Sequence, residues 1–138
     1  MELTADELTE ARRVIARALE EDLRYGPDVT TLATVPADTV ADARIVSRSP
    51  GVLAGIPVVR AVFDLVIGSD NYTVTEELPD GSAVEPGQTV LALRAPATSL
   101  LTAERTALNL LCHLSGIATT TAQWVAAVEG TSAQIRDS

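Results

Sequence analysis

The chain of 138 residues contains no lysine, because all ten of its basic residues are arginines. This absence excludes every mechanism that needs a lysine from the same chain, such as a Schiff base, a lysine general base or the lysine of a phosphate-binding loop. The sequence also has a single histidine, His113, and a single cysteine, Cys112. One residue of each kind cannot build a zinc site of several histidines and cysteines, and a lone cysteine cannot form an internal disulfide. We therefore expect no metal bound by this chain alone.

Positive charge and long apolar runs are also scarce. The formal net charge is −9 and the sequence pI is near 4.4, so binding to nucleic acid is not expected, because affinity for phosphates depends on a basic surface. No apolar run approaches the about 20 residues that cross a bilayer. The N-terminus is acidic and lacks the pattern of a secretion signal. Together these features predict a cytoplasmic protein that binds neither nucleic acid nor membrane, and the 46% hydrophobic content predicts a folded core.

Hydrophobic spacing predicts a mixture of helices and strands in the first hundred residues. Thr4 and Glu7 form a capping-box pattern that opens a helix over residues 5–24. Residues 28–38 are expected to form an irregular connection, and Pro57 is placed in the first turn of a second helix that ends near Gly68. The expected strands are 40–48, 52–54, 72–75 and 88–94. The order of these elements predicts an α+β fold in which an antiparallel sheet packs against helices.

The last forty residues are predicted to be mainly helical. Thr98 is a candidate cap for a helix that runs to Leu114, and Ser115-Gly116 is expected to interrupt it. A further helix is expected over residues 117–128, followed by a strand over 133–136. This final helix and strand are expected to form a region separate from the α+β fold of the first hundred residues.

The helix over residues 98–114 has one apolar face and one polar stripe. Leu100, Ala103 and Ala107 begin the apolar face, and the stripe opposite holds Thr102, Arg105, Asn109 and Cys112, with Glu104 and His113 at its two edges. A solvated surface is one interpretation of this stripe, and structural roles are open for His113 and, as a packed side chain, for Cys112. The alternative is an anion site, because arginine can hold a planar carboxylate through two parallel hydrogen bonds.

Three segments resemble one enzyme family. The most specific is Thr102–Thr119 (TAERTALNLLCHLSGIAT), and the others are Leu19–Thr31 (LEEDLRYGPDVTT) and Gly51–Gly55 (GVLAG). They are similar to the signature segments of quinolinate phosphoribosyltransferase, also called carboxylating nicotinate-nucleotide pyrophosphorylase. The resemblance extends in order over essentially the whole chain.

The resemblance implies a reaction, a fold and two substrate-binding residues. Members convert quinolinate and phosphoribosyl pyrophosphate to nicotinate mononucleotide, carbon dioxide and pyrophosphate, with Mg²⁺, for NAD synthesis. Their N-terminal α/β sandwich precedes an open α/β barrel, and in the dimer it covers the barrel of the other subunit. By this resemblance Arg105 reaches a quinolinate carboxylate across the interface, and Ser138 takes a substrate-binding position that is usually threonine. Glu104, Asn109 and His113 are candidate supporting residues, and no catalytic residue is assigned.

The sequence departs from the family pattern in its length. Family members are about twice as long, and their basic and metal-side residues follow the position of Ser138. We therefore expect residues 1–112 to be the sandwich and residues 113–138 to begin an incomplete barrel, with little activity in this chain alone. A truncated or split enzyme that forms a homodimer or docks on a barrel-containing chain is the first interpretation. A non-catalytic interaction protein and a paralogue for another pyridine carboxylate, including the relative found with molybdate transport systems, are the alternatives.

Overall fold

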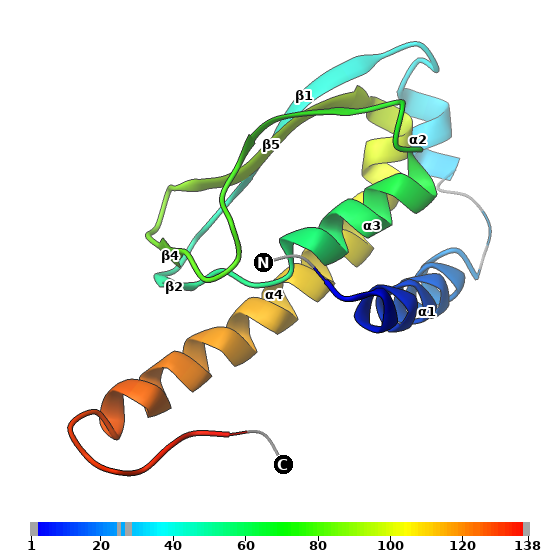
Figure 1. Cartoon of the computed structure of the whole chain (residues 1–138). Helices are drawn as coiled ribbons and strands as arrows, with labels where there is room; N and C mark the ends of the chain where they lie inside the picture. The colour runs from blue at the N-terminus through cyan, green and yellow to red at the C-terminus, as the bar shows by residue number, and fades with distance from the viewer. Residues whose placement is uncertain (1–2, 25, 27–28, 137–138) are drawn as a thin grey trace.

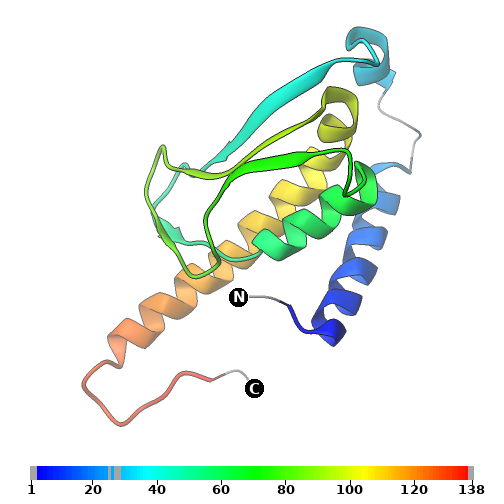
Figure 2. The ribbon, with the colours of Figure 1, turned by 45° about the horizontal axis from the view of Figure 1, so that its top comes forward.

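The computed structural model describes residues 3–24, 26 and 29–136 of the chain. A three-stranded sheet lies over two packed helices, α3 and α4, and helix α1 lies beside them (Figure 1). The second half of α4 projects away from the sheet, and the C-terminal segment turns back beside it (Figure 2). This arrangement confirms the predicted α+β class with an antiparallel sheet and helices.

The N-terminal helix α1, Ala5–Asp22, begins as the sequence predicts. The Thr4 backbone N–H donates to Glu7 Oε2 at 2.8 Å, and the Glu7 N–H donates to Thr4 Oγ1 at 3.3 Å. This reciprocal pair satisfies two N–H groups that a helix start leaves without a partner. The hydrogen bonds also lower the pKa of Glu7, because they favour its charged form. At its other end α1 stops at an acidic side chain, Asp22.

The predicted irregular connection over residues 28–38 is wrong in part. A short helix, α2, spans Val29–Thr34, and residue 28 lies outside the described part of the chain. Within α2 the Thr34 hydroxyl donates to the Thr30 carbonyl at 2.7 Å, as a hydroxyl in a helix can do. Six residues are too few for hydrophobic periodicity to become visible, so the threonine-rich sequence looked like a loop.

The strands form two antiparallel sheets. The main sheet has the order β1–β5–β3, made of Val40–Val46, Thr89–Pro96 and Thr73–Glu77. Ala43 pairs with Leu93 across β1 and β5, on the face that packs against the helices. A two-stranded ladder joins β2, Gly51–Val52, to β4, Ala83–Val84. The four strands predicted in the first hundred residues are confirmed in place, with ends that differ by a few residues, whereas β4 was not predicted.

Helix α3, Ile56–Val66, is preceded by the N-cap residue Gly55, whose φ of +109° suits a residue without a side chain. The Asp80 carboxylate accepts from the Gly55 and Ile56 N–H groups, at 2.9 Å each. The Asp80-Gly81 turn therefore places a negative charge at the positive end of α3. Pro57 occupies the first turn, as expected.

Helix α4, Ala97–Ala127, is one continuous helix of 31 residues. The expected interruption at Ser115-Gly116 is wrong, and so is the cap at Thr98, because the helix is capped at Pro96 and Thr98 lies in its first turn. A glycine inside a helix costs only about 1 kcal/mol, and the contacts of Ser115 and Thr119 with the segment around β2 offset this cost. Residues 133–136, expected as a strand, form none in the described structure.

The core lies between the main sheet and α3 and α4. Its fully buried members include Val59, Val62 and Phe63 from α3, and Leu91 from β5. Ile15 is the buried residue of α1 and joins that helix to the same cluster. In the part of the chain that the structure describes, no helix is long and apolar enough to cross a bilayer.

Candidate functional site

The two faces of α4 that the sequence predicts are both present. Ala103, Ala107 and Leu111 are buried against the core, at 0%, 1% and 5% exposure. Arg105 and Asn109 lie on the opposite side and are exposed. The spacing of 3.6 residues per turn explains this division, since positions 103, 107 and 111 recur on one side of the helix. The first half of α4 thus faces the core on one side and presents a polar stripe on the other.

Arg105 is held loosely at this exposed face. Its side chain is 77% exposed, and Nη1 lies 3.7 Å from Oδ1 of Asp22, the last residue of α1. The second oxygen of the same carboxylate, Oδ2, accepts a hydrogen bond from the Thr106 hydroxyl at 2.9 Å. Thr106 is 2% exposed, so it is a buried polar residue with a partner. The guanidinium remains open to solvent and is able to bind an anion.

The three candidate supporting residues are exposed on α4. Glu104 precedes Arg105, and Asn109 and His113 follow it one and two turns later. Among the described residues, no hydrogen bond or ion pair joins Arg105 to any of them. Ser138 lies outside the described residues. The structure therefore brings Arg105 together with Asp22, while Glu104, Asn109 and His113 share its helix without contacting it.

A shallow hollow of about 560 Å³ lies further along α4. Every residue that lines it belongs to this helix, namely Cys112, His113, Gly116, Ile117, Thr120, Thr121 and Trp124. Cys112, expected to be packed, is exposed here, because position 112 lies on the side of the helix away from the core. Trp124 is 60% exposed and Ile117 is 52% exposed. The hollow is thus an open and partly apolar face of one helix.

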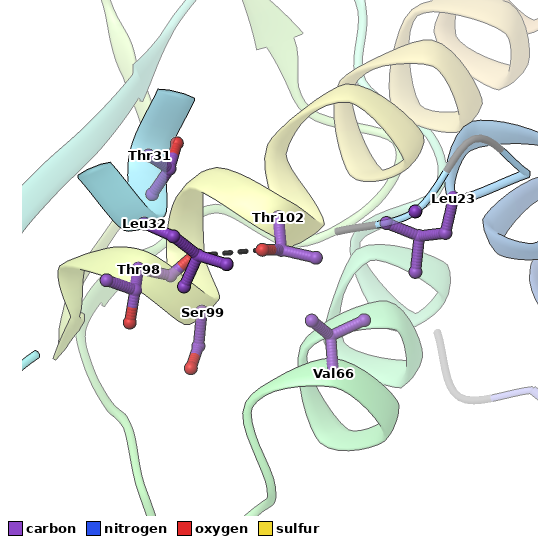
Figure 3. A pocket seen from close by; sticks show the side chains of 8 residues that line it. Leu23, Thr31, Leu32, Val66, Thr98, Ser99 and Thr102 are labelled. Atoms are coloured by element: carbon purple, nitrogen blue, oxygen red, sulfur yellow. Dashed lines mark hydrogen bonds between the residues drawn. The ribbon is translucent and has the colours of Figure 1, made fainter. Parts of the chain in front are cut away.

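A cavity of about 490 Å³ lies where the end of α1 meets α2, α3 and the first turns of α4. Figure 3 shows the hydroxyl residues Thr98, Ser99 and Thr102 of α4 on one side, with Leu23 and Val66 on the other. Thr102 donates to the Thr98 carbonyl at 3.0 Å. The cavity is lined by hydroxyl and apolar side chains. Sequence reasoning missed it because its walls come from four separate elements.

Two residues near Arg105 were also missed. Asp22 and Thr106 are 84 positions apart, so no local pattern could pair them. The available signal was the segment Leu19–Thr31, which contains Asp22 and resembles the same family as the segment around Arg105. The described residues include no group of three or more His, Cys, Asp or Glu side chains able to hold a metal ion.

Fold and site together define an α+β domain that offers a cationic side chain from the exposed face of a helix. Comparison with known proteins identifies the family of this domain. Residues 28–115 match the family model described as "Quinolinate phosphoribosyl transferase, N-terminal domain". The chain therefore belongs to the quinolinate phosphoribosyl transferase family, which confirms the resemblance of the three sequence segments.

Relatives with known names agree with this assignment. The chain is 56% identical over 131 residues to the nicotinate-nucleotide pyrophosphorylase (carboxylating) of Mycobacterium leprae, covering 95% of this chain and 46% of that protein. It is 39% identical over 104 residues to the human protein of that name, covering 75% and 34% respectively. The crystal structure of NadC from Streptococcus pyogenes superimposes with a TM-score of 0.81 at 35% identity, covering 93% of this chain and 44% of that one. The chain spans less than half the length of each relative.

Proposed function

We propose that this chain is the N-terminal part of a quinolinate phosphoribosyltransferase. The complete enzyme transfers the phosphoribosyl group of phosphoribosyl pyrophosphate to quinolinate and releases carbon dioxide and pyrophosphate. The product, nicotinate mononucleotide, enters NAD synthesis, and we place the enzyme in the cytoplasm. Family membership supports the reaction, and the names of the relatives support its substrates.

Arg105 is the residue that we propose binds substrate. The observation behind this role is its guanidinium, 77% exposed on the face of α4 turned away from the core. A guanidinium matches a planar carboxylate through parallel hydrogen bonds, and quinolinate is a planar dicarboxylate. In a homodimer, or in a complex with a barrel-containing chain, Arg105 acts across the interface. Ser138 is proposed to contact the same substrate, with Glu104, Asn109 and His113 in support.

The remaining chemistry belongs, in this proposal, to the barrel domain. Residues 113–138 begin the barrel of their own subunit, and residues 1–112 cover the barrel of the other subunit. A site for phosphoribosyl transfer must stabilise several negative charges, for which enzymes use lysine, arginine and Mg²⁺. This chain has a net charge of −9 and no lysine, so we propose that it is inactive alone. From the family resemblance we assign Mg²⁺ to the complete enzyme, together with its pyrophosphate substrate.

The first test is the replacement of Arg105 by alanine in the complete enzyme. We expect a higher KM for quinolinate, equivalent to roughly 2–4 kcal/mol of lost charge-assisted binding. Steady-state kinetics with quinolinate varied at saturating phosphoribosyl pyrophosphate would measure it. Arg44→Ala, on the exposed side of β1, is a matched control that removes the same charge and should leave KM unchanged. An unchanged KM in the Arg105 variant would refute the proposed role.

Action across the interface has its own test. A full-length relative whose equivalent arginine is replaced by alanine is mixed with this chain, and formation of nicotinate mononucleotide is followed. The unmodified chain should restore turnover by supplying Arg105 in a mixed dimer, whereas the chain with Arg105→Ala should not. Formation of a mixed dimer without restored turnover would contradict action in trans. Sustained turnover by this chain alone would contradict its proposed inactivity.

A non-catalytic docking protein is the second candidate function. The observation that favours it is the exposed apolar surface of the outer half of α4, with Ile117, Trp124 and Val125 each more than half exposed. Apolar groups gathered on one element are typical of an interaction surface. Under this alternative the chain binds a barrel-containing relative, but Arg105→Ala leaves the activity of the complex unchanged. The mixing experiment therefore separates the two functions.

A further inference from the structure

Where the end of α1 contacts the first half of α4, the carboxylate of Asp22 faces two adjacent residues of α4. Asp22 Oδ2 accepts from the buried Thr106 hydroxyl at 2.9 Å, and Oδ1 lies 3.7 Å from Arg105 Nη1. The Asp22 side chain is 25% exposed, against 77% for Arg105. The carboxylate is thus the anchored partner, and the guanidinium is the exposed one.

The electrostatics of α1 do not explain why an acidic residue stands at position 22. It is the last residue of α1, after Glu20 and Glu21, and no basic residue lies in that turn. The C-terminus of a helix bears a partial negative charge, so three acidic side chains there are unfavourable for α1 itself. The described structure gives Asp22 two partners, Thr106 and Arg105, and both belong to α4. The negative charge of Asp22 is therefore stabilised by residues of α4 and not by α1.

We propose that Asp22 is a positioning residue for Arg105, an inference that rests on the proposed role of Arg105 in quinolinate binding. Thr106 orients the carboxylate, and the carboxylate restricts the Nη1 side of the guanidinium. A separation of 3.7 Å is longer than a hydrogen bond, so in this proposal the carboxylate attracts the guanidinium toward the end of α1 and leaves its N–H donors available to a ligand. A long side chain that is already restricted loses less entropy when it binds a ligand. Arg105 then meets a substrate carboxylate in a prepared orientation.

The test uses the complete enzyme with Asp22→Asn, which keeps the size of the side chain and removes its charge. We expect the KM for quinolinate to rise about three- to tenfold with kcat little changed, because binding and not chemistry is affected. Asp22→Glu should recover most of the affinity, whereas a purely structural contact would not show this charge dependence. Glu21→Gln is the matched control, since it removes the same charge at the same end of α1 and should leave KM unchanged.

Thr106 provides a second and independent pair of variants. Thr106→Val removes the hydroxyl that orients Asp22 and should raise KM in the same direction, while Thr106→Ser keeps the hydroxyl and should not. Thermal unfolding of each variant, followed by circular dichroism, shows whether the fold is kept. If Thr106→Ser raised KM as much as Thr106→Val, the effect would come from packing, and the proposed positioning role of Asp22 would be overturned.

A double replacement separates this proposal from the function on which it rests. If Asp22 acts through Arg105, Asp22→Asn should have no further effect on KM once Arg105 is alanine. A KM that falls or stays the same in Asp22→Asn, while Arg105→Ala raises it, overturns the positioning role and leaves the proposed function standing. A KM unchanged in Arg105→Ala overturns the substrate role of Arg105 and the positioning role with it.

Discussion

The hydroxyl of Tyr72 donates to Asp64 Oδ1 at 2.7 Å, and its ring packs edge-on against Phe63 with centroids 5.7 Å apart. Partial burial, and then the hydrogen bond and charge of Asp64, raise the pKa of Tyr72 from 10.0 to about 12. Both causes oppose formation of the phenolate, which would lose hydration and face a carboxylate. The contact with Asp64, near the end of α3, thus stabilises the neutral form of Tyr72.

The raised pKa predicts how stability depends on alkaline pH. A folded pKa above the unfolded value means that the contribution of Tyr72 is fully present below pH 10 and is lost as pH rises toward 12. The phenolate absorbance of the protein, minus that of Tyr72→Phe, should therefore rise near pH 12. Asp64→Asn should lower this titration point, because it removes the negative charge beside the hydroxyl. A titration point at 10 in the unchanged protein would contradict the contact.

Single residues also show what the sequence could reveal about the site. The exposed position of Arg105 was predictable, because it lies on a polar stripe whose helical spacing is visible in the sequence. Asp22 was not, because its contacts with Thr106 and Arg105 join distant parts of the chain, and its acidic neighbours made it look like part of a solvated helix end. The contact of Asp80 with the start of α3 was missed for a similar reason, since an aspartate before a glycine is typical of any tight turn.

At the scale of elements, hydroxyl groups connect α4 to the strand β2. The Val52 N–H donates to Thr119 Oγ1 at 2.9 Å, and the Ala54 N–H donates to Ser115 Oγ at 3.1 Å. A side chain at Gly51 would place its Cβ 2.7 Å from Thr119 Oγ1, so this close approach requires glycine. The Gly51–Gly55 and Thr102–Thr119 segments, which the sequence presents as separate motifs, are in fact two sides of one contact.

Replacing Thr119 by valine tests this connection. Valine keeps the shape but leaves the part-buried Val52 N–H without its acceptor, so we expect a loss of about 1–2 kcal/mol in the free energy of unfolding. Hydrogen exchange at the Val52 amide should accelerate in the same variant. Thr120→Val is the matched control, because the Thr120 hydroxyl donates only to Gly116 within the exposed side of the helix. Equal effects from the two replacements would show that the contact with β2 contributes nothing.

The same contacts explain why a helix break was wrongly expected at Ser115-Gly116. Serine followed by glycine has low helix propensity, and propensity was the only information available from the local sequence. The strands were easier to predict, since alternation in β1 reflects one buried face directly. Local pattern thus located most elements, but the length of α4 depends on partners more than sixty positions away.

At the scale of the whole molecule, the outer half of α4 leaves apolar side chains uncovered. Trp124 is the single tryptophan of the chain and is 60% exposed, so its fluorescence reports directly on this surface. We expect concentration-dependent association, or binding to a barrel-containing relative, with a shift of the Trp124 emission to shorter wavelength as the ring leaves water.

Sedimentation velocity over a range of concentrations measures this association. Val125→Ser, which retains the fluorescent tryptophan, should weaken it. Leu65→Ser, which changes an equally exposed apolar residue on α3, is the control and should not. A protein that remains monomeric at every concentration, and that does not bind the relative, would exclude the outer half of α4 as an interface.

The continuity of α4 has a mechanical consequence. At about 1.5 Å per residue its 31 residues form a rod of about 46 Å, and Arg105 and Trp124 are fixed along it in distance and in azimuth. Insertion of one residue between them would rotate the outer half by about 100° relative to Arg105. Whatever binds the outer half of α4 is therefore held at a fixed rotation about the helix axis relative to the position of Arg105.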